Sequence, residues 1–195
     1  MKIFVGDGAA TPLTPEELEG LIPGHITLRS ELNEFEQRGI EEGSRWAFAR
    51  QRDLLSARFI RTLHRRMFGG VWRWAGAFRT TEKNIGVAPE QISTQLKLLL
   101  DDARYWIEHT TYGPDEICVR FHHRLVQIHP FPNGNGRHAR LMADALIVQL
   151  GGKRFTWGRT NLISKGDGRQ KYLSALKAAD RDLNDVAPLL IFARS

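Results

Sequence analysis

The residues best suited to chemistry lie together in one twelve-residue segment, HPFPNGNGRHAR, at positions 129–140. A histidine opens it, a glycine-asparagine-glycine turn follows, and Arg137 and Arg140 close it. Apolar residues at helical spacing on both sides predict that the segment joins two helices. Glycines let backbone approach a ligand closely, and a helix N-terminus presents N–H groups and a positive dipole end. The segment therefore predicts a cradle for a polyphosphate.

Individual side chains suit that role. Arg137 and Arg140 are three residues apart and share one face of the helix's first turn, where cations oppose the dipole unless an anion lies between them. His129 lies at the rim, and an imidazole of ordinary pKa, ~6.5, can take a proton from an incoming hydroxyl. Asn135 is expected to donate its side-chain amide to a phosphate oxygen, and Phe131 to anchor the loop to the core.

Bulk composition narrows the class of protein. The 195 residues suffice for one domain, and 42% hydrophobic with 26% charged residues is typical of soluble globular proteins. The sequence contains no run of ~18 apolar residues, so no membrane span is predicted, and its first residues lack the pattern of a secretory signal. Cys118 is the only cysteine, which favours a reducing cytoplasm. The net charge of +6 suits an anionic partner, although no block of five basic residues occurs.

Helical signals recur along most of the chain. Thr14, Pro15 and Glu17 form a capping pattern that predicts a short first helix, ending near Gly20 or Pro23. The next helix carries Leu28, Leu32 and Phe35, and glycines at 39 and 43 are expected to threaten a break before Trp46. Further helices are expected at residues 59–67, 89–106, 114–128, 137–150, 172–179 and 186–192.

Residues 77–88, AFRTTEKNIGVA, have no helical period and contain Asn84 and Gly86, so they predict a short β-hairpin or flap. The expected fold class is all-α, a helical bundle around the motif loop with this small β-hairpin flap. Residues 1–49 are expected to form an N-terminal helical segment with a regulatory role, and residues 50–195 the catalytic core, within one compact domain.

The segment 129–140 resembles the signature of the Fic family, His-Pro-Phe-any-Asp/Glu-Gly-Asn-Gly-Arg-any-any-Arg, and matches every fixed position except one. The flanking stretches FHHRLVQI and LMADALIVQLGG resemble the family's flanking helices, and the resemblance covers roughly residues 50–192. The sequence is also similar to a Fic subgroup called mobile mystery protein B. The resemblance implies a Fic fold and a protein adenylyltransferase, which moves AMP from ATP to a Ser, Thr or Tyr hydroxyl of a target protein.

The resemblance also implies residue roles. His129 would deprotonate the hydroxyl that attacks the α-phosphorus, and Arg137 and Arg140 would hold the β- and γ-phosphates. The flap would bind the target as an added strand. The remaining implied positions are Gly134, Asn135 and Gly136 in the anion hole, Tyr172 and Asp180 in the adenine pocket, and Thr80, Thr81 and Lys83 at the flap's target-binding edge.

One departure from the family pattern concerns the metal. The family usually has Asp or Glu at the position of Asn133, where it ligates the Mg²⁺ that bridges the phosphates. Asn133 offers only a neutral carbonyl oxygen, so Mg²⁺ or Mn²⁺ is expected to be held weakly, mainly by phosphates and water. Three outcomes stay open: a slower AMP transferase, a transferase using another phosphate-containing donor, or a nucleotide-binding regulator without turnover.

Regulation is implied by a further resemblance. Many Fic proteins carry an inhibitory helix, Ser/Thr-any-any-any-Glu-Gly/Asn, whose Glu pairs with the motif's second arginine. Glu19-Gly20 ends the first expected helix here, but Thr14 lies five residues before Glu19 instead of four. The hypothesis is that Glu19 bonds Arg140 and blocks ATP. The alternatives are that Glu17 and Glu19 are only cap and surface charges, or that a separate protein inhibits, such as a helix-turn-helix neighbour in a bacterial toxin–antitoxin pair.

Other residues fit simpler interpretations. His122 and His123 are adjacent on a helix and face different sides, which disfavours a shared metal, and His138 is expected to be exposed. Trp72 and Trp74 favour core packing over base stacking. A basic nucleic-acid-binding module would instead show salt-sensitive affinity indifferent to His129, and the anion cradle favours the enzyme.

Overall fold

The computed structural model describes residues 14–24, 26, 28–158, 165–182 and 185–195. Within these ranges the regular structure is helical, apart from one isolated antiparallel β-bridge between Leu21 and Trp72. In chain order the helices are α1 (Pro15–Leu18), α2 (Arg29–Phe48), α3 (Ala57–Phe68), the 3₁₀ helix η1 (Pro89–Gln91), α4 (Ile92–Glu108), α5 (Pro114–Ile128), α6 (Asn135–Gln149), α7 (Lys165–Arg181) and α8 (Ala187–Arg194). The expected mainly helical class is therefore confirmed.

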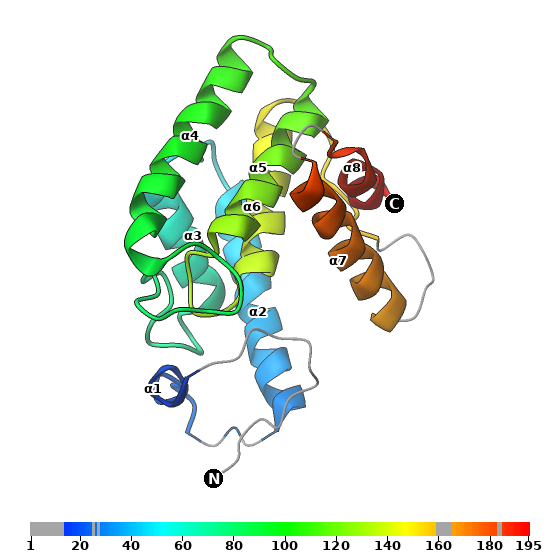
Figure 1. Ribbon diagram of the computed structural model, residues 1–195. Coiled ribbons are helices and arrows are strands. Elements are labelled where there is room, and N and C mark those ends of the chain that lie inside the picture. The colour runs from blue at the N-terminus through cyan, green and yellow to red at the C-terminus, as the bar shows by residue number, and fades with distance from the viewer. Residues whose placement is uncertain (1–13, 25, 27, 159–164, 183–184) are drawn as a thin grey trace.

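Helices α5 and α6 run through the middle of the molecule, with α4 on one side and α7 and α8 on the other (Figure 1). Their buried faces carry apolar side chains such as Phe121 and Ile128 in α5 and Met142 in α6. Helix α3 packs on α2 and also contacts α6. The loop between α5 and α6 is residues 129–134, so the most buried pair of helices holds the segment singled out by the sequence.

Helix α2 runs without a break through Gly39 and Gly43, contrary to the break expected there. The reason is packing against α3. A Cβ added at Gly39 would lie 2.2 Å from the carbonyl oxygen of Met67, and one at Gly43 would lie 2.7 Å from the Met67 side chain. Close contact between the two helices therefore outweighs the helix-propensity cost of glycine, ~1 kcal/mol per residue.

The β-hairpin expected at residues 77–88 is not present, although every residue of this segment is described. The backbone N–H groups of the two arms of loop 77–88 bond to the end of α5 and to Pro130 instead of to each other. The Arg79 N–H donates to the Pro130 carbonyl at 2.9 Å, and the Val87 N–H donates to the Ile128 carbonyl at 3.4 Å. Backbone partners elsewhere in the fold thus replace the pairing that a hairpin would need.

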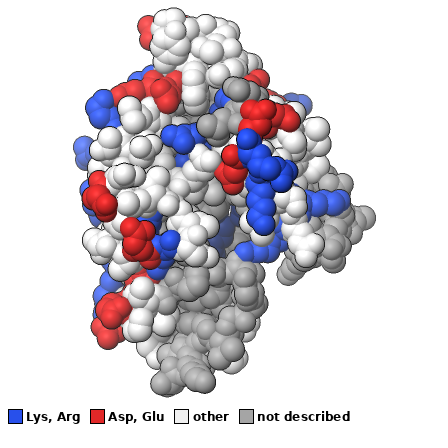
Figure 2. Space-filling model, in the orientation of Figure 1, with Lys and Arg blue, Asp and Glu red and all other residues white. Residues whose placement is uncertain are grey.

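Charged side chains of both signs are interspersed over the face shown in Figure 2, with no broad stripe of one sign among the residues drawn in colour. The excess of positive charge is therefore not gathered into one large basic surface on that face. Among the described residues, no helix has both the length and the apolar character needed to cross a membrane.

Candidate active site

His129 lies where α5 ends, and its backbone takes the left-handed conformation, φ 51° and ψ 58°. Its N–H still donates to the Leu125 carbonyl at 3.2 Å, so the helix is complete up to this residue. A residue with a Cβ adopts this conformation only when its surroundings demand it. The turn leaves the His129 side chain 4% exposed at the end of the central helix pair.

Burial lowers the pKa of the His129 imidazole to about 4. The positive charges of Arg79 and Lys83 also lower it, and a hydrogen bond with the Val126 backbone opposes them. Both main causes penalise the protonated ring. His129 is therefore neutral near pH 7, which is the form that a general base needs.

Arg79 connects loop 77–88 to the end of α5, and its side chain is buried. Its Nε donates to the His129 carbonyl at 2.7 Å, and its Nη1 donates to the Thr81 carbonyl at 3.0 Å. Its Nη2 donates to the carbonyls of Val87 and Ile128. Burial lowers the pKa of the Arg79 guanidinium. Sequence reasoning missed Arg79, because nothing in the local pattern distinguishes it from a solvated loop arginine.

Gly86 allows the loop to approach His129. It has a φ of +108°, which residues with a Cβ rarely adopt. A Cβ at this position would lie 2.7 Å from the His129 Cβ and 2.6 Å from Arg79 Nη2. Contact between the loop and the histidine therefore requires glycine here.

The Asn135 side chain holds the motif loop in shape through two hydrogen bonds with the backbone of Phe131. Its side-chain oxygen accepts from the Phe131 N–H at 2.9 Å, and its side-chain nitrogen donates to the Phe131 carbonyl at 2.8 Å. In this structure the amide therefore fixes the loop instead of pointing to a ligand, so its predicted contribution to the anion hole rests on its backbone N–H. Phe131 itself is fully buried among core side chains.

His64 of α3 supports the same loop and was missed by sequence reasoning. Its ring stacks on Phe131 with centroids 3.7 Å apart. The Gly76 N–H donates to Nδ1 at 3.0 Å, so Nε2 carries the proton and donates to the Asn133 carbonyl at 3.0 Å. Burial lowers the pKa of His64 well below its ordinary value. Its place on the apolar face with Ile60 was the available signal.

His138 was expected to be exposed, and that expectation is wrong, because its side chain is fully buried. Its Nε2 donates to the Ile60 carbonyl at 3.0 Å, and its ring meets Phe131 edge-on at a centroid distance of 5.2 Å. The rotation away from Arg137 was correctly reasoned, but that side of α6 faces α3 instead of solvent. Burial lowers the pKa of His138 to about 3.

The two motif arginines have different partners. Arg137 Nη1 donates to Glu36 Oε2 at 2.7 Å, and Glu36 Oε1 accepts from Trp72 Nε1 at 2.8 Å. Glu36 lies in α2, is 3% exposed, and was missed by sequence reasoning. The signal was a carboxylate four residues after the buried Leu32. Arg140 instead lies over the Tyr172 ring, 5.1 Å from its centroid.

Tyr172 is brought to the motif, whereas Asp180 lies further along the same helix. The Tyr172 hydroxyl bonds His122 Nε2 at 3.2 Å, and burial raises the pKa of Tyr172, partly offset by Arg140. A Cβ at Gly136 would lie 3.7 Å from the Tyr172 hydroxyl and 3.9 Å from Arg140 Nη1. The side of Gly136 that lacks a Cβ thus faces these two groups.

Asp180 binds the side of α5 with its half-exposed carboxylate. Its Oδ1 accepts from His123 Nε2 and from Gln127 Nε2, each at 2.8 Å. His122 and His123 thus have different partners. Among the described residues, no group of three or more His, Cys, Asp or Glu is placed to hold a metal ion.

The sequence places the predicted anion cradle at the start of α6. Gly134 precedes the helix with φ +79°, and a Cβ there would lie 2.7 Å from the Phe68 ring. The first N–H groups of a helix have no acceptor within the helix, so those of α6 are available to an anion. Arg137 and Arg140 lie in the first two turns of the same helix.

Asn133 offers little to a cation. Its side-chain oxygen accepts from the Gly134 N–H at 2.6 Å, which directs it into its own loop. This neutral, already engaged oxygen fits Mg²⁺ poorly, because hard cations prefer charged oxygen ligands. Within the described part of the chain, the motif loop therefore offers a cation no more than this one weak oxygen ligand.

The acidic residues near α1 do not meet Arg140. The carbonyl oxygen of Glu19, the C-cap residue, accepts from Arg73 Nη1 at 3.3 Å. Glu17 instead reaches loop 77–88, where it binds Thr81 and Lys83. The carboxylate paired with a motif arginine is Glu36, and that arginine is Arg137.

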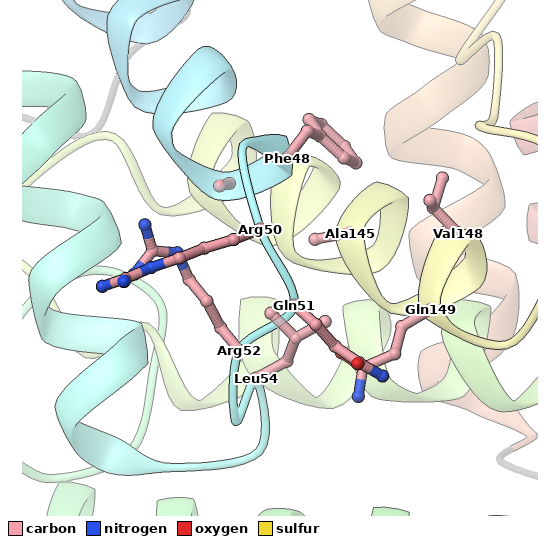
Figure 3. A pocket seen from close by; sticks show the side chains of 9 residues that line it. Phe48, Arg50, Gln51, Arg52, Leu54, Ala145, Val148 and Gln149 are labelled. Atoms are coloured by element: carbon pink, nitrogen blue, oxygen red, sulfur yellow. The ribbon is translucent and has the colours of Figure 1, made fainter.

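A separate cavity of about 290 Å³ lies between the end of α2, the linker to α3 and the last turns of α6 (Figure 3). Its lining includes Phe48, Leu54, Ala145 and Gln149, together with Arg50 and Arg52. No residue of segment 129–140 lines it.

Comparison with known proteins agrees with this geometry. The model of the Fic/DOC family matches residues 54–147. Protein adenylyltransferase fic-1 of Caenorhabditis elegans is 32% identical over 150 residues, which are 73% of this chain and 27% of that protein. The structure of Fic-1 (residues 134–508) from C. elegans has a TM-score of 0.67 at 28% identity, covering 92% of this chain and 52% of that chain.

A second solved structure shares the fold. BepC from Bartonella tribocorum, with bound AMPPNP, has a TM-score of 0.68 at 19% identity, covering 93% of this chain and 97% of that one. The fold is thus that of a Fic domain. The chain belongs to the Fic/DOC family. It spans about a quarter of the length of the curated relatives it matches.

Proposed function

We propose that this chain transfers AMP from ATP to a Ser, Thr or Tyr hydroxyl of a target protein, with His129 as general base. The observation that carries the proposal is a neutral, buried imidazole at the end of α5, on the first residue of the loop that leads into the start of α6. Relatives named protein adenylyltransferases support it, as does the AMPPNP bound to BepC.

In the proposed reaction, the His129 imidazole takes the proton of the target hydroxyl as its oxygen attacks the α-phosphorus of ATP. The new P–O bond joins AMP to the target, the bond between the α- and β-phosphates breaks, and pyrophosphate leaves. The N–H groups at the start of α6 stabilise the charge that develops on the phosphates. Arg137 and Arg140 bind the β- and γ-phosphates, and Glu36 orients Arg137 for this task.

The remaining ligand contacts are part of the same proposal. Tyr172 lines the nucleotide site beside Arg140, and Asp180 is assigned to the adenine pocket by family resemblance. Mg²⁺ or Mn²⁺ enters with ATP, held by the phosphates and water, since Asn133 supplies a poor ligand. Loop 77–88 receives the target segment, with Thr80, Thr81 and Lys83 at its edge.

Regulation is proposed on the same basis. Residues 1–49 are assigned the regulatory role. Family resemblance names Glu19 as the inhibitory residue, whereas the acid of this segment that pairs with a motif arginine in the structure is Glu36, bound to Arg137. A separate inhibitory protein, such as a helix-turn-helix neighbour in a bacterial toxin–antitoxin pair, and a cytoplasmic location also follow from sequence reasoning.

The test incubates the chain with α-labelled ATP and Mg²⁺ or Mn²⁺, alongside His129→Ala and the exposed control His109→Ala. Label should appear on protein and fall about 10²- to 10⁴-fold with His129→Ala only, because general-base catalysis contributes that much. ATP binding without label transfer would favour the regulator without turnover. Transfer from γ-labelled but not α-labelled ATP would contradict AMP transfer and favour a different group.

A further inference from the structure

Helix α1 is joined to loop 77–88 by one side chain, that of Glu17. Its Oε1 accepts from the Thr81 hydroxyl at 2.9 Å, and its Oε2 pairs with Lys83 Nζ at 2.5 Å. The Lys83 side chain is 3% exposed and that of Glu17 is 11% exposed. A pair this buried, 66 residues apart in the sequence, is a defined contact and not a surface charge pair.

This contact lies beside the general base. The Arg79 guanidinium links the Glu17 contact to His129, since it donates both to the Thr81 carbonyl and to the His129 carbonyl. The charge of Lys83 acts on the His129 ring. Gly86 brings the same loop into contact with the histidine. Whatever binds Thr81 and Lys83 is therefore close to the hydroxyl that His129 activates.

The chemistry of this edge favours a carboxylate. Thr81 supplies a hydroxyl donor and Lys83 an ammonium donor, and Arg79 adds a second positive charge behind them. Two carboxylates, Glu82 and Glu17, act on the positive charge of Arg79. Glu82 is exposed to solvent, so Glu17 is the acid bound at this edge. A buried ammonium is costly without an anion, so displacement of Glu17 requires another acid in its place.

We propose that the Thr81–Lys83 edge recognises an acidic side chain of the target segment, and that Glu17 occupies this site until a target arrives. The inference rests on the proposed function, because it assumes a protein target. The target's acid can replace Glu17 without unfolding the rest of the segment, since α1 has only four residues. The residues that follow α1 are attached independently, by the Leu21–Trp72 bridge and by the bond from the Ile22 N–H to the Val71 carbonyl at 2.8 Å. Glu17 can thus leave while the adjoining chain stays bound.

The test uses two pools of 12-residue peptides with a central Thr. One pool carries a single Glu at each other position in turn, and the matched pool carries Gln. The unaltered chain is compared with Glu17→Gln, which keeps the helix cap because Gln serves at that capping position. The control is Glu16→Gln, which alters the exposed acid next to it. Peptide binding is measured by fluorescence anisotropy, and transfer by label from α-labelled ATP.

We expect Glu17→Gln to bind and label the best Glu peptides about tenfold better than the unaltered protein, with little change for Gln peptides, since charge-assisted hydrogen bonds are the stronger class. Glu16→Gln should change neither, and Lys83→Gln in the Glu17→Gln background should abolish the preference for Glu. Equal binding of Glu and Gln peptides by Glu17→Gln would overturn the inference. Discrimination in binding without any label transfer would sustain it and contradict the proposed function instead.

Discussion

The motif loop, which begins at His129, and the contact of α1 with loop 77–88, which Arg79 links to His129, are stabilised in different ways. The motif loop is fixed by buried rings, by its own Asn135 side chain, and by hydrogen bonds that its backbone carbonyls accept from His64 of α3 and Arg79 of loop 77–88. The α1 contact depends on the carboxylate of Glu17 and on one bond from Trp74 Nε1 to the Glu17 carbonyl at 2.9 Å. One side of the site is therefore permanent and the other exchangeable.

For the proposed transfer reaction, the difference separates a precisely held side of the site from an accessible one. The nucleotide side must hold backbone donors in place before the reaction begins, and buried packing achieves this. The target side must admit another protein, so its contacts have to be replaceable by contacts of the same kind. A carboxylate on a lysine and a threonine is replaceable, whereas a Phe131 ring stacked on His64 is not.

The largest expected effect comes from breaking the permanent side with Arg79→Met. The change leaves carbonyls of the loop and of α5 without their donor, and removal of a buried, charged donor costs about 3 kcal/mol. Urea unfolding should show that loss, and label transfer should fall with it. Arg73→Met is the matched control, because Arg73 is an exposed arginine of the preceding segment. Equal stability of the two variants would contradict the permanence of this side.

A smaller effect per residue should follow acidification. The buried His64, His122, His129 and His138 all have lowered pKa values, about 4 for His129 and about 3 for His138. In the unfolded chain these histidines have pKa values near ~6.5, so between pH ~6.5 and pH 4 they bind protons there but not in the folded state. Their contribution is therefore complete above pH ~6.5 and is lost as the pH falls toward 4, by about 1.4 kcal/mol per histidine at pH 5.5.

Thermal or urea unfolding at pH 7.5 and 5.5 checks this dependence. His138→Gln should reduce the loss of unfolding free energy between the two pH values by the contribution of one histidine, because Gln does not titrate. Gln can still donate to the Ile60 carbonyl, so the hydrogen bond is kept. His109→Gln, at an exposed position, is the control. A pH dependence unchanged by His138→Gln would show that this ring is not kept neutral by the fold.

The smallest effect is expected from Glu19→Gly on the exchangeable side. Only the Glu19 carbonyl contacts Arg73 in the structure, and a glycine keeps that carbonyl. Self-labelling should therefore change less than about twofold, below the effect of Glu17→Gln, since exposed charges contribute little. A large increase with Glu19→Gly would reverse the comparison and support the inhibitory pairing with Arg140 that the sequence pattern predicts.

The sequence alone determined where the candidate site lies and which helices surround it. The order of residues in segment 129–140 and the apolar periods on both sides are local signals, so the loop and the start of α6 were predicted from neighbouring residues, and the same signals name His129 as the candidate base. The same local reasoning predicted a break at Gly39 and a hairpin at residues 77–88, where distant partners decided otherwise.

Only the tertiary structure decided which residues hold the site together. His64, Arg79 and Glu36 are identified by partners 36 to 101 residues away, among them backbone carbonyls that carry no sequence signal. The same holds for His138, whose side of α6 faces α3, and for Glu17, whose partners lie in loop 77–88. Helical periodicity predicts which face of a helix is apolar. The partners of the polar side chains buried on that face belong to other elements, and only folding brings the side chains and their partners together.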